Sequence, residues 1–151
     1  MTAGLDDAAV AAIERACARL VLQSIRVFDE QDWLAYASLF TEDGVFLRAN
    51  LPDEPLAGRE AIRAALAARS ATRLTRHLCT NIEIDVLDAE HARGLCYLVL
   101  YAGDALQSES AAGRSADPTQ RVGEYRDVFV RTSEGWRIDR REGRLILYTT
   151  R

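Results

Sequence analysis

The spacing at which apolar residues recur changes near the middle of this chain. Up to about Phe28, residues such as Ile13, Cys17 and Leu20 recur every three or four positions, which is typical of an amphipathic helix. In the later part of the segment from Leu74 to Leu87, apolar and polar residues instead alternate, which predicts a strand with one buried face. Helices followed by strands predict an α+β fold with the helices packed on one face of a sheet.

The same reasoning divides the chain into elements. Asp6 or Asp7 caps a helix that ends near Phe28, Asp32 caps a short second helix, and a third helix covers about 60–69. Strands are expected at 45–48, 74–87, 92–101, 121–131 and 136–148, with a proline-containing loop at 50–55 and a long loop at 103–120. Strands joined by turns this short are antiparallel. We expect one domain over residues 1–151.

Charge and cysteine content narrow the function classes. The net charge of −4 gives no reason to expect a nucleic-acid or membrane-surface partner, and no segment is apolar enough to span a membrane. Three isolated cysteines fit a reduced cytoplasmic protein better than a disulfide framework. His77 and His91 are far apart, and there is no glycine-rich phosphate loop. We therefore expect neither a metal nor a cofactor.

Motifs along almost the whole chain resemble one superfamily. These motifs are Phe28–Trp33, Leu39–Phe46, Gly58–Ile62, Arg76–Asn81, Gly123–Asp127 and Gly135–Arg141. Their order and spacing resemble the nuclear transport factor 2-like superfamily and, within it, the SnoaL-like group that contains scytalone-dehydratase-like and bile-acid-dehydratase-like proteins. The resemblance implies a cone-shaped fold, in which about three N-terminal helices and a strongly curved, mixed but mainly antiparallel sheet enclose a pocket.

The resemblance also implies a site. Asp29 and His77 fall on the positions of the family's catalytic pair, in which a neutral imidazole takes a proton and a carboxylate fixes its tautomer. Without the resemblance, the favoured interpretation of Asp29 is a helix-end cap or a partner for loop amides, and that of His77 is a hydrogen-bonded polar residue between strands. The residues expected to bind substrate are Trp33, Tyr36, Phe46, Asn81, Tyr97, Tyr101, Tyr125 and Phe129.

The function implied is a cofactor-independent lyase or isomerase, similar to a dehydratase, acting on a small hydrophobic cyclic substrate of steroid-like or polyketide-like type. The chain departs from similar dehydratases at Ser24 and Phe28, where those proteins have tyrosines. Two alternatives stay open: the non-catalytic small β subunit of an aromatic-ring-hydroxylating dioxygenase, and a protein that only binds a hydrophobic ligand. We expect a homodimer, or else a homotrimer, formed by the uncovered sheet face.

Overall fold

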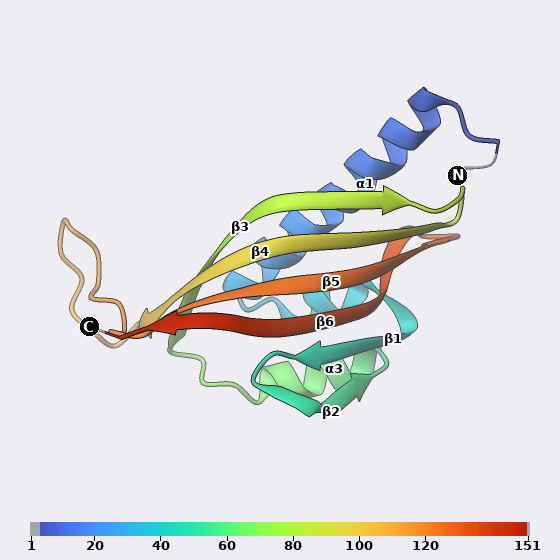
Figure 1. Ribbon diagram of the computed structural model, residues 1–151. Coiled ribbons are helices and arrows are strands. Elements are labelled where there is room, and N and C mark those ends of the chain that lie inside the picture. Colours follow the sequence, from blue (N-terminus) through green and yellow to red (C-terminus); the bar gives the residue numbers. More distant parts are fainter. Residues whose placement is uncertain (1–3, 151) are drawn as a thin grey trace.

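Three helices precede most of the sheet, as the change in apolar spacing predicts. The computed structural model describes residues 4–150 (Figure 1). Its elements are α1 (Asp7–Asp29), α2 (Trp33–Ser38), β1 (Phe40–Arg48), β2 (Leu51–Ala57), α3 (Arg59–Ala67), β3 (Arg73–Val86), β4 (His91–Asp104), β5 (Gln120–Thr132) and β6 (Gly135–Thr149). Within residues 4–150, no helix is long and apolar enough to cross a membrane.

The helix boundaries follow from local chemistry. Asp6 caps α1 because its carboxylate accepts the backbone N–H of Ala9, and Asp32 caps α2 through the N–H of Ala35. Between these two helices Gln31 has a φ of 58°, a left-handed conformation that turns the chain sharply. The first helix therefore ends at Asp29, which places this residue beside the sheet.

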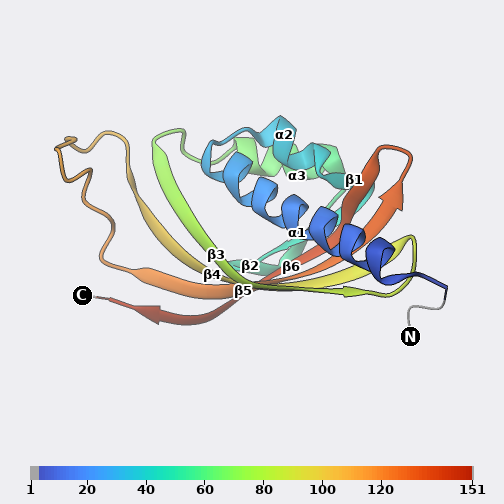
Figure 2. The ribbon, with the colours of Figure 1, turned by 90° about the horizontal axis from the view of Figure 1, so that it is seen from above.

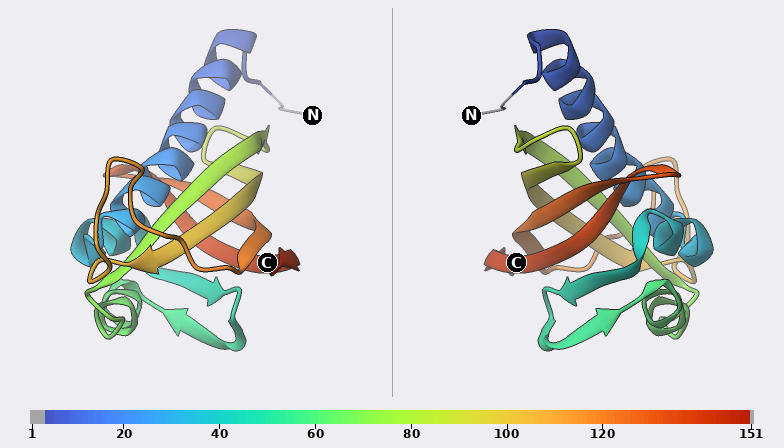
Figure 3. Two further views of the ribbon diagram at one scale, coloured as in Figure 1. Left: turned by 90° about the vertical axis from the view of Figure 1, so that its left-hand side faces the viewer. Right: turned by 90° about the vertical axis from the view of Figure 1, so that its right-hand side faces the viewer.

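The six strands form one mixed sheet in the order β2-β1-β6-β5-β4-β3. All neighbouring strands are antiparallel except β1 and β6, which run parallel. The sheet curves, and Figure 2 shows the three helices lying on its concave side. Seen from its two ends in Figure 3, the sheet stays open, with α1 crossing it obliquely. The expected α+β fold, with helices on a curved and mainly antiparallel sheet, is confirmed.

One predicted loop is wrong. Most of the segment 50–55 belongs to β2, which pairs with β1 through contacts such as Phe46 with Leu56. Pro52 and Pro55 favoured a loop because proline cannot donate a ladder hydrogen bond. However, β2 is the edge of the sheet, and an edge strand tolerates proline where its N–H would face away from the neighbouring strand.

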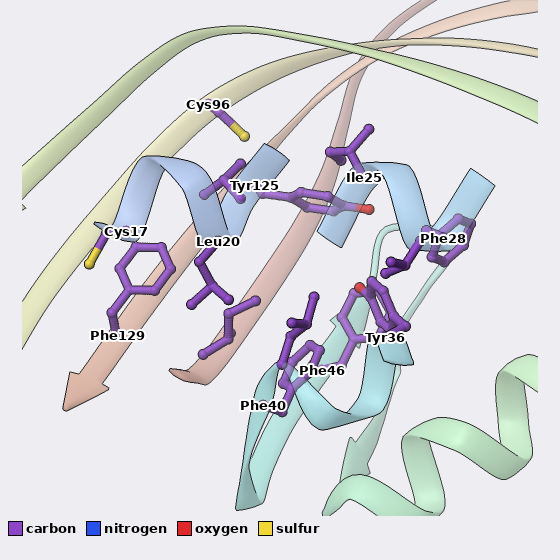
Figure 4. Close-up of a cluster of buried hydrophobic side chains, with 14 of the residues drawn as sticks. Cys17, Leu20, Ile25, Phe28, Tyr36, Phe40, Phe46, Cys96, Tyr125 and Phe129 are labelled. Carbon is purple, nitrogen blue, oxygen red and sulfur yellow. The ribbon is translucent and has the colours of Figure 1, made fainter. Parts of the chain in front are cut away.

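The core lies between α1 and the concave face of the sheet. Aromatic side chains from α1, α2 and β1 gather at one end of it, where the Tyr36 ring lies 5.3 Å from Phe28 and 5.5 Å from Phe40. At the other end the fully buried Phe129 of β5 lies near Cys17 of α1 (Figure 4). The aromatic end of the core supports the last turn of α1, which carries Asp29.

Candidate active site

Asp29 joins the end of α1 to the start of β3 through three hydrogen bonds. Its Oδ1 lies 2.6 Å from His77 Nδ1 and accepts the Thr75 hydroxyl at 2.8 Å, while its Oδ2 accepts the backbone N–H of His77 at 2.9 Å. Thr75 and His77 are two residues apart on a strand, so both side chains point to the same face. The carboxylate is thus held in one orientation against the imidazole.

These contacts determine which atoms carry protons. Burial raises the pKa of the Asp29 carboxyl, but the hydrogen bonds from the side chain and backbone of His77, the charge of His77, and the Thr75 hydroxyl together hold that pKa below its usual value. An ionised carboxylate only accepts hydrogen bonds, so His77 Nδ1 is the donor. In the neutral imidazole, Nε2 then keeps a free lone pair.

The surrounding residues fix the imidazole ring. Phe28 packs edge-on against His77 with ring centroids 5.2 Å apart. The Gln31 side chain donates a 2.6 Å hydrogen bond to the carbonyl of Arg73, which ties the turn after α1 to β3. The end of α1 and the start of β3, which carry Asp29 and His77, are therefore held together by contacts on either side of this pair. Their side chains are only 10% and 9% exposed.

His77 lines a cavity of about 310 Å³ between the helices and the sheet. The apolar part of its wall is formed by Phe28, Phe46, Leu66, Leu98, Leu100, Ala102, Tyr125 and Leu145. The rest of the wall is polar and consists mainly of arginines, with Asn50, Thr75, His77 and Glu124. The cavity thus combines apolar side chains with charged and polar ones, a combination that can bind and orient a small molecule.

Tyr125 contributes a second phenol-bearing side chain to the core, and this one lines the cavity. Within residues 4–150 its hydroxyl makes no hydrogen bond, although the ring is almost fully buried. Burial raises the pKa of Tyr125, and the nearby Tyr36 adds to this effect. The phenol therefore remains protonated at neutral pH and presents a hydrogen-bond donor.

The residues expected to bind substrate divide between the cavity, the core and the outer face. Phe46 and Tyr125 line the cavity. Tyr36 and Phe129 lie in the core, being 1% and 0% exposed, and do not line it. Trp33 packs against Phe28, with ring centroids 5.2 Å apart, on the side of the core.

The other three lie on the opposite face of the sheet or at an irregularity. Tyr97 and Tyr101 occupy odd positions on β4, whereas Leu98 and Ala102 of the same strand face the cavity. Alternation along a strand therefore turns both tyrosines outward, and they are 45% and 37% exposed. Asn81 is exposed at a bulge in β3 and has a φ of 52°, so it does not line the cavity.

A fully buried ion pair beside the cavity was not expected from the sequence. Arg141 of β6 donates from Nε and Nη2 to the two carboxylate oxygens of Asp127 at 2.8 and 2.7 Å, and from Nη1 to the Ser24 hydroxyl at 2.7 Å. Its Cζ lies 4.3 Å from the centroid of the Tyr125 ring. Ser24, which stands where similar dehydratases have a tyrosine, is thus a partner of a buried arginine.

One signal in the sequence could have revealed that Asp127 pairs with an arginine. Asp127 and Arg141 lie on either side of the tight turn at 133–135, and they are direct partners in the β5–β6 register. Counting outward from the turn pairs Asp127 with an arginine, but with Arg140, because a bulge between Val128 and Phe129 shifts the register by one residue.

No metal site accompanies these residues. Within residues 4–150, no group of three or more histidine, cysteine, aspartate or glutamate side chains is arranged to hold a metal ion.

Comparison with known proteins points to one family. The model of the SnoaL-like domain matches residues 9–142. A search of curated proteins finds no match. Among solved structures, a scytalone dehydratase candidate from Novosphingobium aromaticivorans superposes with a TM-score of 0.80 at 22% identity, covering 97% of this chain and 92% of that one.

Two further structures share the fold. A hexachlorocyclohexane dehydrochlorinase, LinA type 2, matches with a TM-score of 0.79 at 15% identity, covering 97% of this chain and 93% of that one. An aromatic ring hydroxylase candidate from Novosphingobium aromaticivorans matches with a TM-score of 0.72 at 20% identity, covering 91% and 92%. At such identities the likeness establishes the fold alone.

Proposed function

This chain belongs to the SnoaL-like domain family, and from that membership and its pocket we propose that it is a dehydratase-like lyase or isomerase. Its substrate would be a small hydrophobic cyclic compound of steroid-like or polyketide-like type, and it would need no cofactor. The observation that carries this proposal is the contact of 2.6 Å between Asp29 and His77 at the wall of the cavity. Dehydratase and dehydrochlorinase structures among the matches support the same reaction class.

In the proposed reaction His77 is the base. Its Nε2 takes a proton from the carbon next to a ring carbonyl, and the electron pair of the broken C–H bond moves to the carbonyl oxygen as an enolate. The enolate then re-forms the carbonyl and expels a hydroxyl from the β-carbon, which leaves as water with the proton from the imidazolium. For an isomerase, the imidazolium returns the proton to a different carbon.

Two neighbours assist in this proposal. Asp29 stays ionised, so it stabilises the imidazolium that forms after proton transfer. Tyr125, whose raised pKa keeps its phenol protonated, donates to the enolate oxygen. Tyr125 would thus perform the task of the tyrosines that this chain lacks at Ser24 and Phe28, approaching from β5 rather than from α1.

A bicyclic β-hydroxy ketone tests the proposal. Loss of water from 3-hydroxy-1-tetralone gives 1-naphthol, which is followed by its fluorescence, and NMR follows deuterium exchange next to the carbonyl of 1-tetralone. The wild type should catalyse both reactions, and His77→Gln should lower each rate by about 10²–10⁴-fold. The matched control is His91→Gln, because His91 forms a similar but exposed pair with Asp88.

The results of these experiments distinguish the three candidate functions. Equal rates for His77→Gln and the wild type would remove His77 as the base. Tight binding of the ketones without exchange would instead favour a ligand-binding protein. Purification with a larger oxygenase subunit would favour the dioxygenase β subunit, for which the hydroxylase candidate supplies a shared fold.

We also propose that the chain is one domain that works in the cytoplasm as a homodimer or homotrimer. The uncovered sheet face supports assembly because it exposes large apolar side chains, with Leu78 57% and Tyr97 45% accessible. Sedimentation equilibrium measures the oligomeric state directly, and Leu78→Glu should shift the equilibrium toward the monomer.

A further inference from the structure

The charge of the cavity wall differs from that of the whole chain. The chain carries a net charge of −4, whereas the lining of the cavity contains five arginines and one carboxylate, that of Glu124. The five arginines are Arg48, Arg69, Arg73, Arg121 and Arg144. Cationic groups gathered at a cleft with low-dielectric walls attract anions.

Two of these arginines are occupied by carboxylates outside the cavity. Arg73 Nη2 lies 2.6 Å from Asp117 of the loop between β4 and β5. Arg48 Nη2 lies 3.3 Å from Glu54 of β2, yet its Nε is buried and has no hydrogen-bond partner within residues 4–150. Although Arg48 pairs with Glu54, its Nε therefore remains an unsatisfied donor beside the cavity.

The charges of the other three arginines are less neutralised by nearby carboxylates. Arg144 lies 3.8 Å from Glu124 and 3.7 Å from Glu142, and neither contact is a hydrogen bond. Arg69 and Arg121 have neither a salt bridge nor a side-chain hydrogen bond within residues 4–150. The wall thus holds two guanidinium groups for which the described part of the chain supplies no counter-charge.

Arg69 lies close to the reacting pair. Its Cζ is 5.1 Å from the centroid of the Phe28 ring, and the His77 ring packs against that same Phe28 at 5.2 Å. Partial burial of the Arg69 guanidinium, with the positive charges of Arg73 and Arg48 nearby, lowers its pKa. An anion beside Arg69 would offset this mutual repulsion.

From these contacts we propose that the cavity binds an amphipathic anion, a ring compound that carries a carboxylate, sulfonate or phosphate group. Arg69, which lies over the Phe28 ring, holds the anionic group together with Arg121 of the same wall, and the apolar rings occupy the part of the chamber lined by Leu98 and Leu100. That the anion is also a substrate depends on the function proposed above, whereas its binding does not.

Two fluorescent probes with the same rings test the proposal. 8-Anilino-1-naphthalenesulfonate carries a sulfonate, and N-phenyl-1-naphthylamine is the same molecule without it. Fluorescence titration should show that the wild type binds the sulfonate at least about tenfold more tightly, as a charge-assisted contact predicts. Raising the salt concentration from 0.05 to 0.5 M should weaken sulfonate binding and leave the neutral probe unchanged.

Variants locate the anion. Arg69→Gln should weaken sulfonate binding by about tenfold and change neutral binding by less than about twofold, and Arg69→Lys should restore most of the loss. The matched control is Arg63→Gln, since Arg63 lies on the preceding helix α3 but pairs outside the cavity with Glu60. Thermal melting checks that each variant is folded.

Three results would overturn the proposal: equal affinity for both probes, equal effects of Arg69→Gln and Arg63→Gln, or no binding of either probe. The test also separates this proposal from the catalytic one. A preference for the sulfonate without turnover of 3-hydroxy-1-tetralone would retain the anion site and remove the lyase. Turnover of 3-hydroxy-1-tetralone without a preference for the sulfonate would instead retain the lyase and remove the anion site.

Discussion

Asp29 binds His77 at two points, through the ring Nδ1 and through the backbone N–H of the same residue. The backbone contact fixes where the carboxylate lies along β3, and the ring contact fixes how the imidazole is turned. A single carboxylate at the end of α1 therefore sets both the position and the tautomer of the histidine.

Removing the charge of Asp29 should affect catalysis more than folding. Asp29→Asn keeps the shape but can donate to Nδ1, which favours the tautomer with the proton on Nε2 and so removes the base. We expect turnover of 3-hydroxy-1-tetralone to fall by about 10²–10⁴-fold. Asp88→Asn, which alters the exposed pair with His91, should leave turnover unchanged. Equal losses in the two variants would contradict this assignment.

The lowered pKa of Asp29 makes its contribution to stability depend on pH. A carboxyl with a lower pKa in the folded chain stabilises the fold above its unfolded pKa, near 3.8, and loses this effect as the pH falls through its folded pKa. The free energy of unfolding of the wild type should exceed that of Asp29→Asn by about 1–3 kcal/mol at pH 6. This difference should shrink below about pH 4. Urea denaturation at pH 6, 4.5 and 3.5 measures it, and a constant difference would contradict the prediction.

The buried pair of Asp127 and Arg141 should be sensitive to loss of one partner. Arg141→Met leaves the Asp127 carboxylate buried without its counter-charge, which costs about 3–5 kcal/mol. The double variant Arg141→Met/Asp127→Leu removes both charges and should be distinctly more stable than Arg141→Met alone. Urea denaturation compares them. A double variant that is less stable than Arg141→Met would show that the charges contribute more than packing can replace.

Gly94 leaves space for the ring of Phe129. A Cβ at position 94 would lie 2.8 Å from Phe129 Cε2, so Gly94→Ala should reduce the free energy of unfolding by about 1–3 kcal/mol. Adding Phe129→Leu should restore part of that loss, which urea denaturation detects. Phe129→Leu alone should change the affinity for N-phenyl-1-naphthylamine by less than about twofold, because Phe129 lies in the core. A larger change would place Phe129 at the ligand.

The charge of Asp117 should oppose anion binding. Asp117 pairs with Arg73 at the cavity wall, so Asp117→Asn removes a competing negative charge. We expect the affinity for 8-anilino-1-naphthalenesulfonate to rise by about two- to fivefold and that for the neutral probe to stay unchanged. Glu109→Gln, which alters a pair with Arg114 in the same loop, is the control. A weaker affinity for the sulfonate would mean that Asp117 orders Arg73 for binding.

Much of the fold was predictable because each half of the chain has one clear apolar period. Caps at Asp6 and Asp32, and the tight turn before Gly135, mark boundaries through local chemistry alone. β2 was missed because its prolines are tolerated only at a sheet edge, and which strand forms the edge depends on the whole topology.

The site was less predictable, and for a different reason. Asp29 and His77 come from sequence segments that pair only in three dimensions, so their contact was accessible through resemblance rather than spacing. Tyr97 and Tyr101 are expected from the sequence to bind substrate, whereas strand alternation turns them to the face of the sheet opposite Leu98. The burial of Arg141 depends on Ser24, which lies 117 residues away.

The parallel pairing of β1 with β6 has a consequence for how the chain folds. Phe46 of β1 lies beside Arg141 of β6. The hydrogen bonds between these two strands therefore form only after β6 has been synthesised. Until then the hairpin of β1 and β2 has no neighbour in the sheet, and Asp127 has no counter-charge. Contacts this distant along the chain slow folding. The ladder between β1 and β6 should therefore form late in folding.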